Sequence, residues 1–306
     1  MMNTSSPKLW LVATLLCIAA SALHGDLAEA QDAPKPAIFF TDRGAHKVFS
    51  ASLDGKDQKV LAKFSSANLR GVAADVPNGK LYFIDNGSDK IYSVNLDGTG
   101  LKAIAFVPGF PADLALHRKS KKLYWCDQQN GRIRRCNVDG SEIETVVETK
   151  QPYYLDVDEE GDMLYWGTFY VGGRIHRRKL SGGKVETLIA APAAGIIQIR
   201  AVKVDTAKNQ IYWVDREAFK IQRGKIEKGK IVAIEDLYTG LDTPHGMVLD
   251  LEGKSLYWGD TGTNEEPGSK GSHCVMMGSL DGKAPAKVVY KGSQPWDVDV
   301  YRPAKK

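Results

Sequence analysis

Six copies of an aromatic-rich pentapeptide recur along this chain at intervals of 41 to 47 residues. They are IFFTD from Ile38, LYFID from Leu81, LYWCD from Leu123, LYWGT from Leu164, IYWVD from Ile211 and LYWGD from Leu256. No helical period lies between the copies, and one short sheet cannot bury both of its faces alone. The repeat therefore predicts an all-β fold, a radial array of six sheets, and it says less about function than about the scaffold.

Each repeat predicts four short strands. A small apolar strand such as 246–250 precedes the pentapeptide, and a third strand such as IYSVNLDG from Ile91 follows it. Asp-Gly at the end of that strand is a strong hairpin signal, because glycine accepts a positive φ without strain. Ile91 and Leu96 have opposite parity and so point to opposite faces. Burial of both faces is what a propeller blade requires.

The first pentapeptide begins on the second strand of its repeat, and the missing first strand is found at 297–301. We therefore expect the C-terminal strand to pair with the three N-terminal strands. This arrangement closes the ring and removes exposed sheet edges.

Residues 1–30 have the pattern of a secretory signal peptide. Lys8 precedes an apolar run from Leu9 to Leu23, and Ala28-Glu29-Ala30 offers a cleavage site before Gln31. Leu15-Leu16-Cys17 is the alternative, a lipoprotein box, but Leu16 is too bulky for its position. We expect an exported, monomeric product, periplasmic or extracellular, whose residues 31–306 form one propeller with no membrane insertion. A formal net charge of +4 does not indicate that the protein binds nucleic acid.

The cysteines Cys126, Cys136 and Cys274 remain after cleavage. In the predicted hairpin Cys126 lies opposite Ile133, and Cys136 lies opposite Leu123. This offset exceeds the reach of a disulfide, roughly 7 Å between Cα atoms. We therefore expect all three to be unpaired apolar side chains.

These residues resemble the YWTD (class B) repeat of the low-density-lipoprotein receptor family, a six-bladed β-propeller, over residues 38 to 301. Arg134, Arg177 and Arg223 fit the arginine position of that repeat. The signature threonine survives only at Thr41, and Thr168 replaces one aspartate. No cysteine-rich modules flank the repeats, so receptor architecture does not follow from the resemblance.

The resemblance implies that a protein or peptide ligand binds the face formed by the loops that precede the first strands. Aligning the repeats there places aromatic and basic side chains around one rim: Arg70, Phe110, Tyr153, Tyr154, Arg200, His245 and Trp296. Arginine and aromatic residues on a rigid rim are typical of protein-binding hot spots. The alternative is that Tyr153 and Trp296 only plug the channel. The loop Thr261–His273 on this face is either a partner contact or a tolerated insertion.

A second function class is a calcium-dependent lactonase with the metal in the channel. Its oxygen ligands would be Asn68, Asp113, Asp156, Asp297 and Asp299. Lys203 opposes them, and no Glu or His joins them as a base, so we expect a non-enzymatic protein without a cofactor. The aspartates that end the pentapeptides are predicted to accept backbone N–H bonds.

Basic residues cluster on two predicted third strands: Arg132, Arg134, Arg135, Arg174, Arg177, Arg178 and Lys179. An anionic polysaccharide is one partner that such a surface suggests. The alternative, which we favour, is that alternate arginines pair within their own blades.

Overall fold

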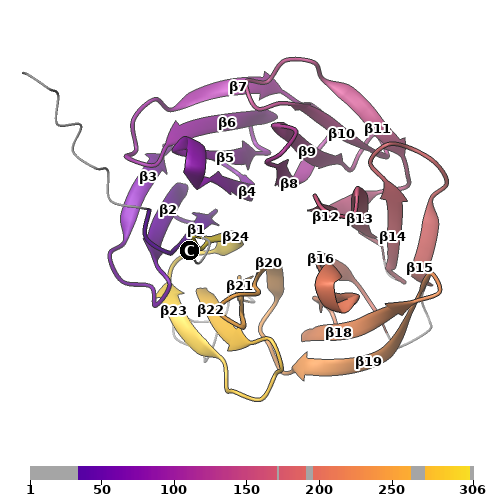
Figure 1. Cartoon of the computed structure of the whole chain (residues 1–306). Coiled ribbons are helices and arrows are strands. Elements are labelled where there is room, and N and C mark those ends of the chain that lie inside the picture. The colour runs from indigo at the N-terminus through magenta and orange to yellow at the C-terminus, as the bar shows by residue number, and fades with distance from the viewer. Residues whose placement is uncertain (1–33, 171, 191–195, 263–272, 304–306) are drawn as a thin grey trace, which may run out of the picture. The chain divides into compact units, whose positions relative to one another are not determined.

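The computed structural model describes residues 34–170, 172–190, 196–262 and 273–303. The predicted signal peptide and most of the Thr261–His273 loop lie outside the described residues. The described part of Pro34–Lys306 forms six four-stranded antiparallel sheets around a channel, which confirms the six-bladed propeller (Figure 1). No helix among these residues is long and apolar enough to cross a membrane.

Each blade consists of an inner, a second, a third and a fourth strand, in this order from the channel outward. The inner strands are β4 (Leu69–Asp75), β8 (Pro111–His117), β12 (Pro152–Asp158), β16 (Ile199–Asp205), β20 (Pro244–Asp250) and β24 (Pro295–Tyr301). The second strands carry the pentapeptides and are β1 (Ala37–Asp42), β5 (Lys80–Asp85), β9 (Lys122–Asp127), β13 (Met163–Thr168), β17 (Gln210–Asp215) and β21 (Ser255–Asp260).

The outer half of each blade holds the third and fourth strands. The third strands are β2 (Lys47–Ser52), β6 (Lys90–Asn95), β10 (Arg132–Asn137), β14 (Arg174–Lys179), β18 (Lys220–Glu227) and β22 (Cys274–Ser279). The fourth strands are β3 (Lys59–Lys63), β7 (Lys102–Phe106), β11 (Glu144–Glu148), β15 (Glu186–Ala190), β19 (Lys230–Tyr238) and β23 (Lys287–Lys291). Two single turns of 3₁₀-helix, η1 (Val76–Asn78) and η3 (Thr206–Lys208), join inner to second strands.

The ring closes as the sequence predicted. Strand β24, yellow in Figure 1, lies beside the indigo β1 and completes the sheet β24-β1-β2-β3. Ile38 pairs with Val300 and Phe40 with Val298 in this antiparallel ladder. The inner strands contact one another in the cyclic order β4, β8, β12, β16, β20, β24 and back to β4. The six inner strands therefore surround the channel as a closed ring, although each remains the edge strand of its own sheet.

Both faces of each blade are buried between neighbours. Ile91 packs in a cluster with Leu123 and Trp125 of the following blade, whereas Leu96 packs against Val48 and Leu61 of the preceding one. The aromatic side chains of the pentapeptides lie at the centre of these interfaces and are fully buried: Phe40, Phe83, Trp125, Trp166, Trp213 and Trp258. The parity argument made from the third strand is thus confirmed.

Most aspartates that end the pentapeptides hold backbone rather than a ligand. The carboxylate of Asp215 accepts hydrogen bonds from the amides of Ile197 and Gln198, at 2.7 and 2.8 Å. Asp42 does the same for Ser293 and Gln294, at 2.9 and 2.8 Å. Each of these carboxylates fixes the loop that leads into the inner strand of its blade.

The three cysteines among the described residues are buried and form no disulfide, as predicted. Cys126 lies opposite Ile133 and Cys136 opposite Leu123 in the β9–β10 ladder. Burial raises the pKa of the Cys136 thiol to about 12 and that of Cys126 well above its ordinary value. Neither thiol is therefore ionised at neutral pH.

Candidate functional site at the channel mouth

The channel has two different ends. At one end, here called the mouth, the inner strands begin and the second strands finish, so their loops meet there. The seven predicted rim residues all belong to this end: six lie at the starts of β4, β12, β16, β20 and β24, and Phe110 directly precedes β8. The alignment of repeats therefore placed them on one face correctly.

Their side chains do not project freely from that face. Only Phe110 is half-exposed, whereas the other six are buried. The guanidinium of Arg70 stacks 4.1 Å from the centre of the Trp296 ring and 5.2 Å from that of Phe110. Its Nη1 donates to the hydroxyl of Tyr153 at 3.1 Å. Side chains from four blades thus meet over the channel through a single arginine.

A second arginine continues the contact network. The guanidinium of Arg200 lies 4.5 Å from the Tyr153 ring and 4.6 Å from that of Phe169. The ring centres of His245 and Trp296 lie 3.9 Å apart, and the guanidinium of Arg43 lies 5.0 Å from the centre of the Trp296 ring. We call this set the arginine–aromatic layer: Arg43, Arg70, Phe110, Tyr153, Phe169, Arg200, His245 and Trp296. Tyr153 and Trp296 are packed across the channel, as the alternative of a plug expected. Ligand binding at the layer stays a prediction.

Two members of the layer, Arg43 and Phe169, were missed from the sequence. Each directly follows a pentapeptide, after Asp42 and Thr168, and Arg216 takes the same place after Asp215. The position directly after each second strand is therefore a further repeat position whose side chains lie at the mouth. Reading the repeat one position further would have found it.

The layer is positively charged, and no carboxylate in the described part of the chain forms an ion pair with its arginines. Burial lowers the pKa of Arg200, and the nearby cations Arg216 and Arg70 add to the effect. Burial, and then Arg200, also hold the pKa of His245 well below its usual value, so this imidazole is neutral. Its Nδ1 lies 3.0 Å from the carbonyl oxygen of Thr243, which can only accept, so this nitrogen carries the proton.

Tyr154 lies deeper than its neighbour Tyr153. Its side chain is only 1% exposed, and its hydroxyl has no hydrogen-bond partner among the described residues. Tyr154 precedes Asp156 by two positions on β12, so both side chains are on the same side of the strand. It separates the layer from the charged groups further along the channel.

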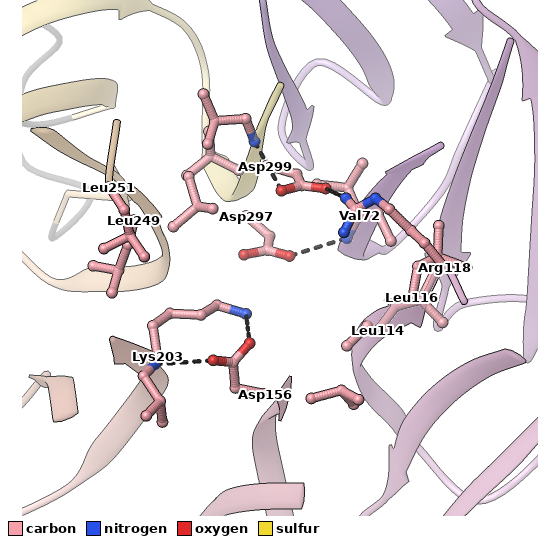
Figure 2. Close-up of a pocket in the computed structure, with 17 residues that line it drawn as sticks. Val72, Leu114, Leu116, Arg118, Asp156, Lys203, Leu249, Leu251, Asp297 and Asp299 are labelled. Atoms are coloured by element: carbon pink, nitrogen blue, oxygen red, sulfur yellow. Dashed lines mark hydrogen bonds and ion pairs between the residues drawn. The ribbon is translucent and has the colours of Figure 1, made fainter. Parts of the chain in front are cut away.

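The channel carboxylates bind the backbone of the next blade, and Figure 2 shows this contact for Asp156 and Asp297. Asp113 accepts from the amide of Leu155 at 2.9 Å, and Asp156 accepts from that of Val204 at 2.9 Å. Across the closure, Asp297 and Asp299 accept from the amides of Val72 and Ala74, at 3.0 and 2.8 Å. These aspartates connect neighbouring inner strands, whose backbones form no ladder with each other.

Two cations balance part of this charge. The ammonium of Lys203 lies 3.5 Å from Asp156 and donates to the carbonyl of Leu155 at 3.4 Å, and Arg118 lies 3.8 Å from Asp299. Burial raises the pKa of Asp113 to about 6 although Lys203 opposes the shift, and burial also raises that of Asp297. A cavity of about 270 Å³ lies at the end of the channel opposite the mouth. Leu249 and Leu251 form an apolar wall of this cavity, and its charged lining residues are Arg118, Asp156, Lys203, Asp297 and Asp299.

The predicted calcium ligands do not fit a calcium ion. Asn68 is not among the channel carboxylates: its amide donates to Asn86 at 3.0 Å, and it lines a separate cleft. The four aspartates each commit an oxygen to a backbone amide, and the Lys203 ammonium lies among them. No three Asp, Glu, His or Cys side chains in the described ranges are grouped to hold a metal. Lactone hydrolysis through such an ion gains no support from this geometry.

The basic residues on β10 and β14 are neutralised in part. Arg132 pairs with Asp127 at 2.8 Å, Arg135 with Glu144 at 2.6 Å and Arg177 with Glu186 at 2.8 Å. These pairs lie within single blades, as the favoured interpretation of the sequence expected. Binding of an anionic polysaccharide stays an untested alternative.

Sequence comparison finds relatives over about half of the chain. A protein of Pyricularia oryzae named low-density lipoprotein receptor-related protein 1 is 27% identical over 50% of this chain and 53% of its own length. The human low-density lipoprotein receptor-related protein 5-like protein is 28% identical over 47% of this chain and 56% of that protein. The mouse low-density lipoprotein receptor-related protein 5 is 26% identical over 49% of this chain but only 9% of the receptor. The chain thus aligns with about half of the length of the first two relatives, and no protein-family model matches it.

Structural comparison covers more of the fold. A chain in the crystal structure of a nidogen/laminin complex superposes with a TM-score of 0.74 and 19% identity. The match spans 87% of this chain and 98% of that one. It shows that the six-bladed architecture is shared.

Proposed function

Because the chain is a six-bladed propeller of the low-density-lipoprotein receptor class B repeat type, we propose that it is an exported binding module that captures a protein or peptide segment at the channel mouth. The module acts as a monomer, without catalysis and without a cofactor. Export is proposed from the signal-peptide pattern of residues 1–30 and from the receptor names of the relatives. The choice between periplasm and extracellular space is left to experiment.

The arginine–aromatic layer is the observation that carries the proposal. It joins side chains of all six blades into one rigid surface, and Phe110 and Phe169 within it remain half-exposed. Ile197, which leads into β16, is 38% exposed beside them. Rigid aromatic and arginine side chains with exposed apolar edges are typical of protein-binding hot spots, because they lose little entropy on binding. The structural neighbour belongs to a nidogen/laminin complex, an assembly of two proteins, which agrees with this class of partner.

The burial of the layer decides which substitutions test the proposal. Tyr153→Ala or Trp296→Ala would remove a packed side chain and lower stability, so loss of binding would be ambiguous. Ile197→Asp changes only an exposed side chain at the mouth. Leu251→Asp is a matched control, since Leu251 is 44% exposed at the opposite end of the channel.

The experiment is selection from a random peptide library on the immobilised chain from Gln31 onward. We expect enriched peptides that bind the unchanged protein and the Leu251→Asp variant equally, and that bind the Ile197→Asp variant at least about tenfold more weakly. Peptides that bind the two variants equally would place the contact surface elsewhere and refute the assignment of the mouth.

A further inference from the structure

The mouth contains two buried arginines that have no acidic partner among the described residues. Arg70 is 5% exposed and Arg200 is 6% exposed. Neither forms an ion pair with any residue of the described ranges, and Nε of Arg70 and both Nε and Nη1 of Arg200 have no hydrogen-bond acceptor there. We propose that these two guanidiniums recognise the carboxylate of an aspartate or glutamate side chain on the peptide partner. This inference rests on the proposed function and specifies its ligand.

Other arginines of the propeller show what is missing at the mouth. Arg132, Arg135, Arg177 and Arg223 each face a carboxylate on the same blade, although all of them are more exposed than Arg70 and Arg200. An uncompensated buried charge is costly, and proteins ordinarily pair it or leave it in water. Arg70 and Arg200 are the two buried arginines among the described residues, and both lie at the mouth, where an incoming group can supply the missing counterion.

The surroundings reinforce the need for an anion. Arg43 and Arg216 are the nearest further charges, and Arg216 already pairs with Glu217. His245 packs on Trp296 with its Nδ1 proton directed to the carbonyl of Thr243, so it offers no negative charge. The channel aspartates are committed to the backbone amides of Val72, Ala74, Leu155 and Val204.

The geometry favours a planar carboxylate. Both guanidiniums lie over aromatic rings, Arg70 over Trp296 and Arg200 over Tyr153 and Phe169, which fixes their planes. A guanidinium held in one plane presents parallel N–H donors that match the two oxygens of a carboxylate. Bidentate recognition of this kind gives orientation as well as affinity.

The burial of Arg70 and Arg200 favours a peptide over a polyanion. Guanidiniums this deeply placed admit one side chain at a time, whereas a sulfated polysaccharide contacts exposed cations along a stripe. The cleft that includes Arg43 has a volume of about 430 Å³, and its other polar lining residues are His46, Asn68, Ser88, Gln294 and Asp85, whose carboxylate accepts from the amide of Asn68 and the hydroxyl of Ser88. Amide and hydroxyl groups of this kind pair with an extended peptide backbone. Phe110 and Ile197 are placed to contact apolar side chains next to the acidic one.

The test begins from the library-selected peptides. We expect them to share an aspartate or glutamate, and we expect its replacement by asparagine or glutamine to weaken binding about thirtyfold or more, measured by fluorescence anisotropy. Arg70→Met and Arg200→Met should each cause a loss of the same size, and the loss should not add to that of the amide peptide. These two variants should not melt at a lower temperature, because each removes an unpaired buried charge.

Arg223→Met is the matched control. Arg223 pairs with Glu235 and donates to the carbonyl of Leu280 at 2.8 Å, away from the mouth. This variant should melt at a lower temperature and bind the peptides normally. Arg200→Lys keeps the charge without the planar fork and should recover only part of the affinity.

The outcomes separate this inference from the proposed function. Peptides that bind at the mouth, as judged by Ile197→Asp, but lack an acidic residue or tolerate both methionine variants would overturn the inference and leave the function standing. Selection of no mouth-binding peptide would overturn both. Heparin or inorganic sulfate that binds through Arg70 and Arg200 more tightly than any acidic peptide would overturn the assignment to a peptide.

Discussion

The carboxylate of Asp297 on β24 accepts a hydrogen bond from the backbone amide of Val72 on β4, at 3.0 Å, across 225 positions of sequence. This bond joins the last inner strand to the first one that the chain forms. Asp113 and Asp156 make the same kind of bond between other neighbouring blades. The carboxylates that suggested a metal site in the sequence therefore have a structural explanation.

Asp297→Ala should destabilise the fold. It leaves the buried amide of Val72 without an acceptor, which costs about 1–3 kcal/mol of unfolding free energy. Asp297→Asn keeps an acceptor oxygen and removes a buried charge, so we expect a smaller loss. Urea unfolding of both variants measures the difference, and equal losses would mean that the hydrogen bond is not what stabilises the closure.

Stability should fall as pH rises from mildly acidic to neutral values, in part because of Asp260. Burial raises the pKa of this carboxyl to about 8, and Asp242 adds to the shift. A raised pKa means that the folded state holds the proton more tightly than the unfolded state, whose pKa is about 3.9. The resulting stabilisation is complete below that value and is lost as pH rises through about 8. Asp260→Asn cannot titrate, so its unfolding free energy should vary less with pH over this window. Parallel pH curves for the two proteins would contradict the assignment to Asp260.

The cysteines should label only when the protein opens. Cys126, Cys136 and Cys274 are buried, and burial raises the pKa of each thiol. On the chain from Gln31 onward we expect a thiol reagent at neutral pH to react slowly in buffer and at once in denaturant. Mass spectrometry should show three labels after denaturation without reductant. Fewer than three would reveal a disulfide.

Gly246→Ala should be strongly destabilising. The added methyl group would overlap Oδ1 of Asp297, because β20 and β24 approach closely at this point. Overpacking of this kind costs about 1–3 kcal/mol or more. Gly87→Ala is the control, since its methyl group would lie 3.2 Å from Oδ1 of Asp85 and face no backbone closer than 3.4 Å. Thermal unfolding of the pair measures the effect, and similar melting temperatures would mean that the inner strands can move apart cheaply.

The architecture was predictable because it depends on periodicity and parity alone. The pentapeptides set the number of blades, and Ile91 and Leu96 showed that both faces are buried. The missing inner strand of the first repeat predicted the pairing of β24 with β1. Even the offset of Cys126 and Cys136 followed from counting along a hairpin.

The burial of the site residues and their hydrogen-bond partners were not predictable in the same way. Repeat alignment placed Arg70, Tyr153 and Trp296 at one level of the ring, but it could not tell that they fold inward onto one another. Whether a side chain such as Asp297 faces a metal or a neighbouring amide depends on the distance between blades, which no local pattern encodes. Asn68 shows the same limit, since the irregular pairing between Leu69 and Val72 leaves it beside the outer cleft.

The closing strand also has a consequence for biosynthesis. Residues 37–63 form only three strands of their blade, and the fourth comes from residues 295–301. During translation this incomplete sheet must wait until nearly all of the remaining chain has left the ribosome. The ring can therefore become fully cooperative only after residues 295–301 have been synthesised, and a product that stops before them would expose an unpaired β edge to chaperones and proteases.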